Sequence, residues 1–190
     1  QKTAYEMCGR DWSSDVCSSD LGISDEQAAT LMLKGMTVQY LIRRTYAVKA
    51  GDTVLFHAAA GGVGLFACQW LKALGATVIG TVGSEDKGEL ARAHGCDHVI
   101  LYRHEDIAGR VREITGGRGC DVAFDSVGAS TFMPCLDALR PRGMLVTFGN
   151  ASGPVEPVSP LELAKRGSLL LTRPRLADYY ASAEETAEAA

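Results

Sequence analysis

Residues 55–64, LFHAAAGGVG, join an apolar run to a group of small residues and glycines, and an apolar-periodic run follows at 65–71. A strand, a tight turn and a helix in this order place free backbone N–H groups and the positive end of a helix dipole beside an anion. Gly61 lets the backbone approach a pyrophosphate, and Gly64 lets the helix pack tightly on the strand. The segment therefore predicts a dinucleotide site, with a plain strand-to-helix turn as the alternative.

A second predicted strand ends at Val82, and Gly83, Ser84 and Lys87 follow it. A site that prefers NAD has an Asp or Glu there to hold the ribose 2′-hydroxyl. A hydroxyl and an ammonium instead suit a 2′-phosphate, which favours NADP(H) as the cofactor. The alternative is that Ser84 only caps the next helix and Lys87 is a solvated charge. Glu85 and Asp86 are interpreted as first-turn acids that face away from the ligand.

Three further loops follow predicted strands. Tyr102 and Arg103 close the third strand, where they either reach the same adenosine phosphate or form a surface pair. The loops at 125–128 and 148–150 lie at the carboxyl edge of the sheet, where ligands bind in open α/β folds. His57 is predicted to be a hydrogen-bonded structural histidine rather than a catalyst. No general acid or other catalytic residue is identified.

Strands and helices are predicted to alternate along the chain. The predicted strands lie near 53–58, 77–82, 98–101, 121–125, 143–148 and 168–172, and the predicted helices near 62–74, 85–94, 105–114, 129–139 and 160–166. This alternation indicates an α/β fold, a doubly wound parallel sheet with helices on both faces. The apolar stretch at 122–124 is expected to be buried on both sides.

The chain divides into four predicted segments: a leader at 1–21, connecting helices at 22–48, a nucleotide-binding domain at 49–175, and a C-terminal helix at 176–190. Ser24 is the expected N-cap of the first connecting helix, with Gln27 at the capping-box position. Residues 34–37 are expected to interrupt that helix, and a helical pattern resumes over 38–46.

Residues 11–21, DWSSDVCSSDL, have no helical or strand period. In one reading frame they back-translate to a string that resembles a widely used DNA-sequencing adapter. We interpret this stretch as translated adapter sequence joined to a gene fragment, and therefore not as part of the folded domain. A genuine polar linker is the alternative.

Composition narrows the possible partners. A formal net charge of −4 favours neither a nucleic-acid nor a membrane partner. The longest apolar runs are too short to span a bilayer, and no signal peptide is recognisable. The six cysteines have no metal-ligand spacing and are expected to be free thiols, so no metal site is predicted. Free thiols indicate a reducing compartment, the cytoplasm.

Seven motifs follow one another along the chain: Lys34–Thr37, His57–Gly64, Ile79–Ser84, Tyr102–Arg103, Phe124–Gly128, Phe148–Asn150 and Thr172–Pro174. Together they resemble the NADPH:quinone oxidoreductases (zeta-crystallin-like) of the medium-chain dehydrogenase/reductase superfamily. The resemblance implies a Rossmann domain beside a GroES-like catalytic domain. It also implies a homodimer that works without zinc and transfers hydride from NADPH to quinones or other electron-poor acceptors.

The resemblance also assigns site residues. Thr37 and Tyr40 are expected to border the nicotinamide, and Gly62 and Val63 to hold the pyrophosphate. The residues expected around the adenosine phosphate are Gly83, Ser84, Lys87 and Tyr102, and those expected to line the ribose and nicotinamide are Ser126, Phe148, Gly149 and Asn150. A GroES-like domain is expected before Gly22 and is missing, so this chain alone is expected to bind NADPH weakly and turn over nothing.

Several other functions remain open. A zinc-free enoyl or alkenal reductase of the same superfamily would share these cofactor motifs, and a non-catalytic NADPH-binding protein would share them too. A methyltransferase also has a glycine loop, but its second strand usually ends in an acid that holds the ribose hydroxyls. Gly83 and Ser84 speak against it.

Overall fold

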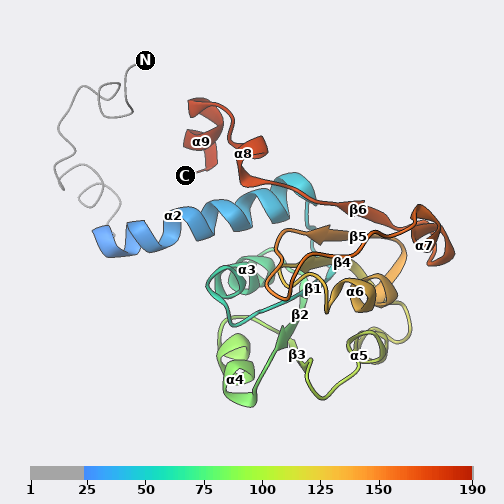
Figure 1. Cartoon of the computed structure of the whole chain (residues 1–190). Coiled ribbons are helices and arrows are strands. Elements are labelled where there is room, and N and C mark those ends of the chain that lie inside the picture. The colour runs from blue at the N-terminus through green and yellow to red at the C-terminus, as the bar shows by residue number, and fades with distance from the viewer. Residues whose placement is uncertain (1–23, 190) are drawn as a thin grey trace.

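The structure, a computed structural model, describes residues 24–189 (Figure 1). The interpretation of residues 11–21 as adapter sequence lies outside this range, as do Cys8 and Cys17. Within the described range, no helix combines the length and apolar character needed to cross a bilayer.

Six parallel strands form one sheet in the order β3-β2-β1-β4-β5-β6. The strands are β1 (Thr53–Phe56), β2 (Thr77–Val82), β3 (His98–Leu101), β4 (Cys120–Asp125), β5 (Leu139–Thr147) and β6 (Leu170–Thr172). This is the strand order of doubly wound dinucleotide-binding folds, and the order reverses between β1 and β4. The predicted fold class is therefore confirmed, and every residue of β4 is buried as expected.

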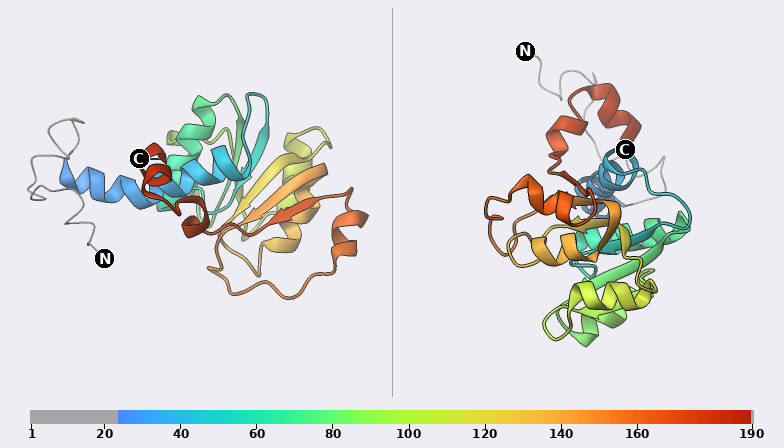
Figure 2. Two further views of the ribbon diagram at one scale, coloured as in Figure 1. Left: turned by 90° about the horizontal axis from the view of Figure 1, so that it is seen from above. Right: turned by 90° about the vertical axis from the view of Figure 1, so that its right-hand side faces the viewer.

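Helices cover both faces of the sheet, as predicted (Figure 2). One face carries α2 (Asp25–Gln39), α3 (Gly62–Ala73) and α4 (Glu85–Ala93), whose apolar side chains share a core with Phe56 and Phe124. The other face carries α5 (Ile107–Ile114) and α6 (Phe132–Ala138), which pack on Leu55 and Leu145. Alternate residues of the central strands thus enter opposite cores, which explains their unbroken apolar sequence.

The connecting helix differs from its prediction. The capping box between Ser24 and Gln27 is confirmed, but α2 continues without a break through the predicted interruption at 34–37. Gly35 lowers helix propensity by about 1 kcal/mol, and the packing of α2 along α3, with Val38 fully buried, outweighs that cost. The helix then widens into a π-helical segment, η1 (Tyr40–Thr45), before the chain enters β1.

Two other boundaries also differ. Strand β5 begins at Leu139, four residues before its predicted start at 143, because the β4–β5 register shifts between Cys120 and Val122 and admits the extra residues. Helix α6 is shorter than its predicted range of 129–139: it begins at Phe132 and ends at Ala138, where β5 takes over. Helix α7 (Pro160–Lys165) starts after its predicted N-cap, Ser159.

The C-terminal segment has two short helices, α8 (Leu176–Tyr179) and α9 (Ala183–Ala189), where a single helix is predicted. They lie beside α2 and η1 (Figures 1 and 2). The Tyr180 hydroxyl donates to the carbonyl of Met36 at 2.8 Å, and the Arg44 guanidinium lies 5.5 Å from the ring centre of Tyr179. These contacts hold the end of the chain against the connecting helix.

Candidate functional site

The glycine loop joins β1 to α3 at the point where the strand order reverses. Helical hydrogen bonding in α3 begins at Leu65, whose N–H donates to the Gly61 carbonyl at 2.9 Å. The N–H groups of the first turn, at 62–64, precede this bond and face the carboxyl edge of the sheet. A Cβ on Gly64 would lie 2.6 Å from the Ala59 carbonyl oxygen, so the close packing predicted for Gly64 is confirmed.

A small pocket of about 110 Å³ opens beside this loop. Its lining residues are Ala58, Ala60, Gly61, Val82, Gly83, Lys87 and Tyr102. Three separately predicted segments therefore meet in one place, through Gly61, through Gly83 and Lys87, and through Tyr102. The pocket combines the N-cap glycine of α3, an aromatic ring and an ammonium group, and the ammonium group suits a phosphorylated adenosine.

Gly83 and Tyr102 are in close contact within this pocket. A Cβ on Gly83 would lie 3.1 Å from the Tyr102 hydroxyl, so the ring tip occupies the space beside the end of β2. An acidic side chain at this position would have to displace the tyrosine. The local shape thus agrees with the absence of a ribose-binding acid there.

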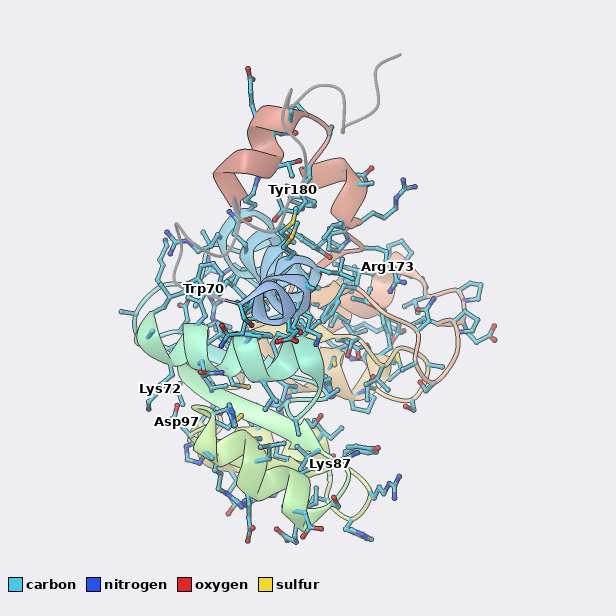
Figure 3. The ribbon with its side chains drawn as sticks, turned by 90° about the vertical axis from the view of Figure 1, so that its left-hand side faces the viewer. Trp70, Lys72, Lys87, Asp97, Arg173 and Tyr180 are labelled. Carbon is cyan, nitrogen blue, oxygen red and sulfur yellow. The ribbon has the colours of Figure 1, made fainter. Side chains whose placement is uncertain are left out.

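Ser84 occupies the N-cap position of α4 as predicted, but its side chain makes no capping hydrogen bond. The hydroxyl is exposed and remains available to a ligand. Glu85 and Asp86 lie in the first turn of α4, which is where the sequence places them. Lys87 follows on the same turn with an exposed side chain, visible in Figure 3.

The loops after β4 and β5 meet each other at the carboxyl edge. A Cβ on Gly149 would lie 2.8 Å from the Ser126 Cα, so only glycine allows these loops to approach so closely. The Phe148 ring packs toward Phe56, with ring centres 6.1 Å apart. Asn150 is exposed and lines a second hollow of about 360 Å³. Ser126, Phe148, Gly149 and Asn150 are thus brought together, apart from the first pocket.

Thr37 and Tyr40 lie on the connecting helix and its π-helical end. The Thr37 hydroxyl donates to the Leu33 carbonyl at 2.7 Å. The Tyr40 ring is buried and stacks on Tyr179, with ring centres 4.8 Å apart. Burial raises the pKa of Tyr40 to about 12. Neither side chain lines the pocket beside the glycine loop, and their expected contacts with nicotinamide stay a prediction.

His57 is a structural histidine, as predicted. It is fully buried, and its Nδ1 and Nε2 atoms lie 2.9 Å from the Thr81 hydroxyl and 3.0 Å from Cys135 Sγ. Burial lowers the pKa of His57 to about 4, against an opposing effect of the Asp125 charge. The ring is therefore neutral at physiological pH and holds the end of β1 against β2 and α6.

Among the described side chains, one group has donor atoms close enough to suggest a metal site: His57, Asp125 and Cys135. The group does not fit zinc, which takes four ligands in structural sites and an accessible open position in catalytic ones. Asp125 already accepts hydrogen bonds from the Val127 N–H and the Thr131 hydroxyl, both at 2.8 Å. All three residues are buried, so the group is a hydrogen-bonded part of the core.

Comparison with known proteins agrees with this geometry. Residues 62–188 match the family described as zinc-binding dehydrogenase. The chain belongs to this family. It is 58% identical over 158 residues to a quinone oxidoreductase of Pseudomonas aeruginosa, covering 83% of this chain and 49% of the relative. It is also 53% identical over 170 residues to a 2-haloacrylate reductase of Burkholderia, covering 89% and 51%.

The dehydrogenase fold is shared with solved structures. A quinone oxidoreductase of Escherichia coli complexed with NADPH superposes with a TM-score of 0.86 at 53% identity, covering 88% of this chain and 52% of that one. The resemblance to quinone oxidoreductases of the medium-chain superfamily is thus confirmed, and it concerns their nucleotide-binding half. The chain spans about half the length of the curated relatives it matches.

Two residues near the site had no predicted role. Arg173 follows β6 and donates to the Thr147 hydroxyl at 3.1 Å and to the Gly149 carbonyl at 3.0 Å, so it holds the loop after β5. Lys34 lies on α2 beside Gly62. Both residues belong to the motifs that carry the family resemblance. Their spacing in the sequence does not indicate that Arg173 contacts the loop after β5 or that Lys34 lies beside the glycine loop.

Proposed function

We propose that this chain is the nucleotide-binding half of a zinc-free oxidoreductase that transfers hydride from NADPH to quinones. The observation that carries the proposal is the pocket formed by Gly61, Gly83, Lys87 and Tyr102. It pairs a glycine-lined helix start with an ammonium group, at the strand end where an NAD site has an acid. A quinone oxidoreductase that is 53% identical to this chain and was solved with NADPH supports the same assignment.

The chain's own residues would position the cofactor. First-turn amides at 62–64 would hold the pyrophosphate, and Ser84 and Lys87 would hold the adenosine phosphate. The loop at 148–150, held by Arg173, would border the nicotinamide side. Bound NADPH supplies a hydride for reduction. The residues that contact the acceptor are assigned to the part of the enzyme outside this chain, so the chain alone is expected to turn over nothing.

A titration of the 190-residue chain with NADPH and NADH, followed by nicotinamide fluorescence, tests the proposal. We expect an enhancement with NADPH and a much weaker response with NADH, because only NADPH presents a phosphate to Lys87. Equal responses would remove the basis for NADP(H) preference. No response to either would favour a protein that does not bind nicotinamide nucleotides. Robust quinone-dependent NADPH oxidation by this chain would contradict its assignment as an inactive half.

The second candidate is reduction of an activated carbon–carbon double bond, such as that of an enoyl or alkenal substrate. It is favoured by the identity of 53% to a 2-haloacrylate reductase, which is comparable to the identity to quinone oxidoreductases. Both reactions use the same hydride donor. Assays of the full-length enzyme with a quinone and with an electron-poor alkene would separate them.

We further propose that the full-length enzyme is a homodimer, as the family resemblance implies. Strand β6 lies at the edge of the sheet, and its Leu170 and Leu171 side chains are 49% and 41% exposed. An apolar edge strand is a ready surface for pairing with another copy. Light scattering of the full-length enzyme and of a Leu171→Lys variant tests this, since the variant is expected to shift toward monomer.

The proposed location is the cytoplasm, in accordance with the expected free thiols. Cys68, Cys96, Cys120 and Cys135 are all free and buried in the structure. Thiol titration of protein isolated under conditions that prevent oxidation tests this proposal. Reduced thiols at all four positions are expected in a reducing compartment.

A further inference from the structure

Lys34 reaches the start of helix α3 from the neighbouring helix α2. A Cβ built on Gly62 would lie 2.9 Å from Lys34 Cε and 3.4 Å from its Nζ. Gly62 is the first residue of α3, directly after the N-cap Gly61. The lysine side chain is partly buried, and helices α2 and α3 pack along each other. The ammonium group therefore lies beside the first turn of the glycine-loop helix.

This position is electrostatically unfavourable for a cation. The start of a helix carries about half a positive elementary charge, and positive side chains are stabilised at the opposite end. In the described part of the chain, Lys34 pairs with no carboxylate. By contrast, Lys72 lies in the last turn of the same helix and pairs with Asp97. An anion bound at the first turn of α3 would attract the Lys34 ammonium group and offset its repulsion from the positive end of the helix dipole.

We propose that Lys34 is a cofactor-binding residue that contacts the pyrophosphate of the dinucleotide at the start of α3. This inference rests on the proposed function, because it assumes that a dinucleotide occupies the glycine loop. Gly62 then has two roles. Its lack of a side chain lets the phosphates approach the backbone, and it leaves room for the end of Lys34.

Lys34 and Lys87 thereby act on different parts of the ligand. Lys87 lines the pocket next to Gly83, where the phosphate that distinguishes NADPH from NADH would lie. The pyrophosphate near Lys34 is common to both nucleotides. Loss of the Lys34 charge therefore weakens NADPH and NADH alike and leaves their affinity ratio unchanged. Loss of the Lys87 charge weakens NADPH alone.

The experiment compares four forms of the 190-residue chain: wild type, Lys34→Met, Lys34→Arg and Lys49→Met. Met keeps the apolar stem of lysine and is a good helix former. Lys49 is exposed and precedes β1, at the opposite edge of the sheet, so Lys49→Met is a control for the change in net charge. Dissociation constants for NADPH and NADH come from nicotinamide fluorescence, with saturation-transfer NMR for weak binding. Circular dichroism and thermal unfolding check that each variant folds.

We expect Lys34→Met to weaken both nucleotides by about tenfold, the effect of losing one charge-assisted hydrogen bond. Lys34→Arg should keep most of the affinity, and Lys49→Met should match the wild type. An unchanged affinity of folded Lys34→Met, or a loss confined to NADPH, would overturn the inference and leave the proposed function intact. A wild-type chain that binds neither nucleotide would overturn both.

Discussion

Charged side chains at the two edges of the parallel sheet differ in whether they have partners within the protein. At the amino edge, Asp121 is the second residue of β4 and accepts from the Thr53 N–H at 2.8 Å, from Arg140 at 2.6 Å and from Arg118 at 2.5 Å. Asp97 precedes β3, pairs with Lys72 and accepts from the Val78 N–H (Figure 3). The polar groups of this edge are thus bound to one another.

At the carboxyl edge, backbone amides and cations lie next to pockets. Lys34 and Lys87 pair with no carboxylate within residues 24–189, and the first-turn amides of α3 face the same edge. The buried acid there, Asp125, is fully engaged with the amides and hydroxyl of its own loop. The difference indicates that charge at the amino edge stabilises the fold, whereas we propose that Lys34 and Lys87 at the carboxyl edge bind a ligand.

The largest expected effect concerns His57, which lies just beyond β1 at the carboxyl edge. Its folded pKa of about 4 lies below the unfolded value of 6.5, so the unfolded chain binds the proton more tightly. The stability that depends on neutral His57 is fully present above pH 6.5. It is lost as the pH falls toward 4, and the free energy of unfolding then decreases by roughly 3 kcal/mol. Urea unfolding between pH 7 and 4.5 measures the loss. A His57→Asn variant should show a flatter pH dependence, and parallel curves would contradict the assignment.

The next effect tests the amino edge. Asp121→Asn removes the charge that binds two arginines, and its side chain is only 4% exposed. We expect a loss of about 2 kcal/mol in the free energy of unfolding, with NADPH affinity unchanged. Asp178→Asn is the matched control, since Asp178 is 62% exposed in its pair with Arg175. A changed NADPH affinity in folded Asp121→Asn would contradict the inference that charge at the amino edge affects stability alone.

Lys87→Glu is the corresponding change at the carboxyl edge. The free energy of unfolding should change by no more than about 0.5 kcal/mol, because the side chain is exposed. NADPH affinity should fall by about tenfold or more, equivalent to about 1.4 kcal/mol, while NADH affinity should not fall. Nucleotide titration of Lys87→Glu beside Lys49→Glu measures this. An unchanged ratio of NADPH to NADH affinity would show that Lys87 does not contact the phosphate that distinguishes the two nucleotides.

The smallest effect is expected for Lys72→Met. Lys72 is 55% exposed and its partner Asp97 keeps the bond from the Val78 N–H. Exposed ion pairs contribute about 0 to 1 kcal/mol, so the free energy of unfolding should hardly change. Neither nucleotide should bind differently. Thermal unfolding and titration of this variant set the lower limit against which the Lys34 and Lys87 variants are compared.

Local sequence was sufficient for the sheet and for the glycine loop. Alternating apolar segments predicted the strands and most helices, because burial on both faces of a parallel sheet requires continuous apolar residues. Gly64 could be assigned to close helix packing, and Gly83 and Ser84 directly after β2, where an NAD site has an acid, predicted the preference for NADP(H). These features depend on residues that are close together in the sequence.

Features that depend on contacts between distant segments were decided only by the tertiary structure. Helix α2 passes through Gly35 because packing on α3 outweighs its low helix propensity, and Tyr40 is buried because the C-terminal segment returns to cover it. The meeting of Lys34 with Gly62, and of Arg173 with Gly149, likewise joins segments far apart in sequence. The physical reason is that periodicity and turn chemistry act over a few residues, whereas packing and electrostatics act between whatever surfaces the fold brings together.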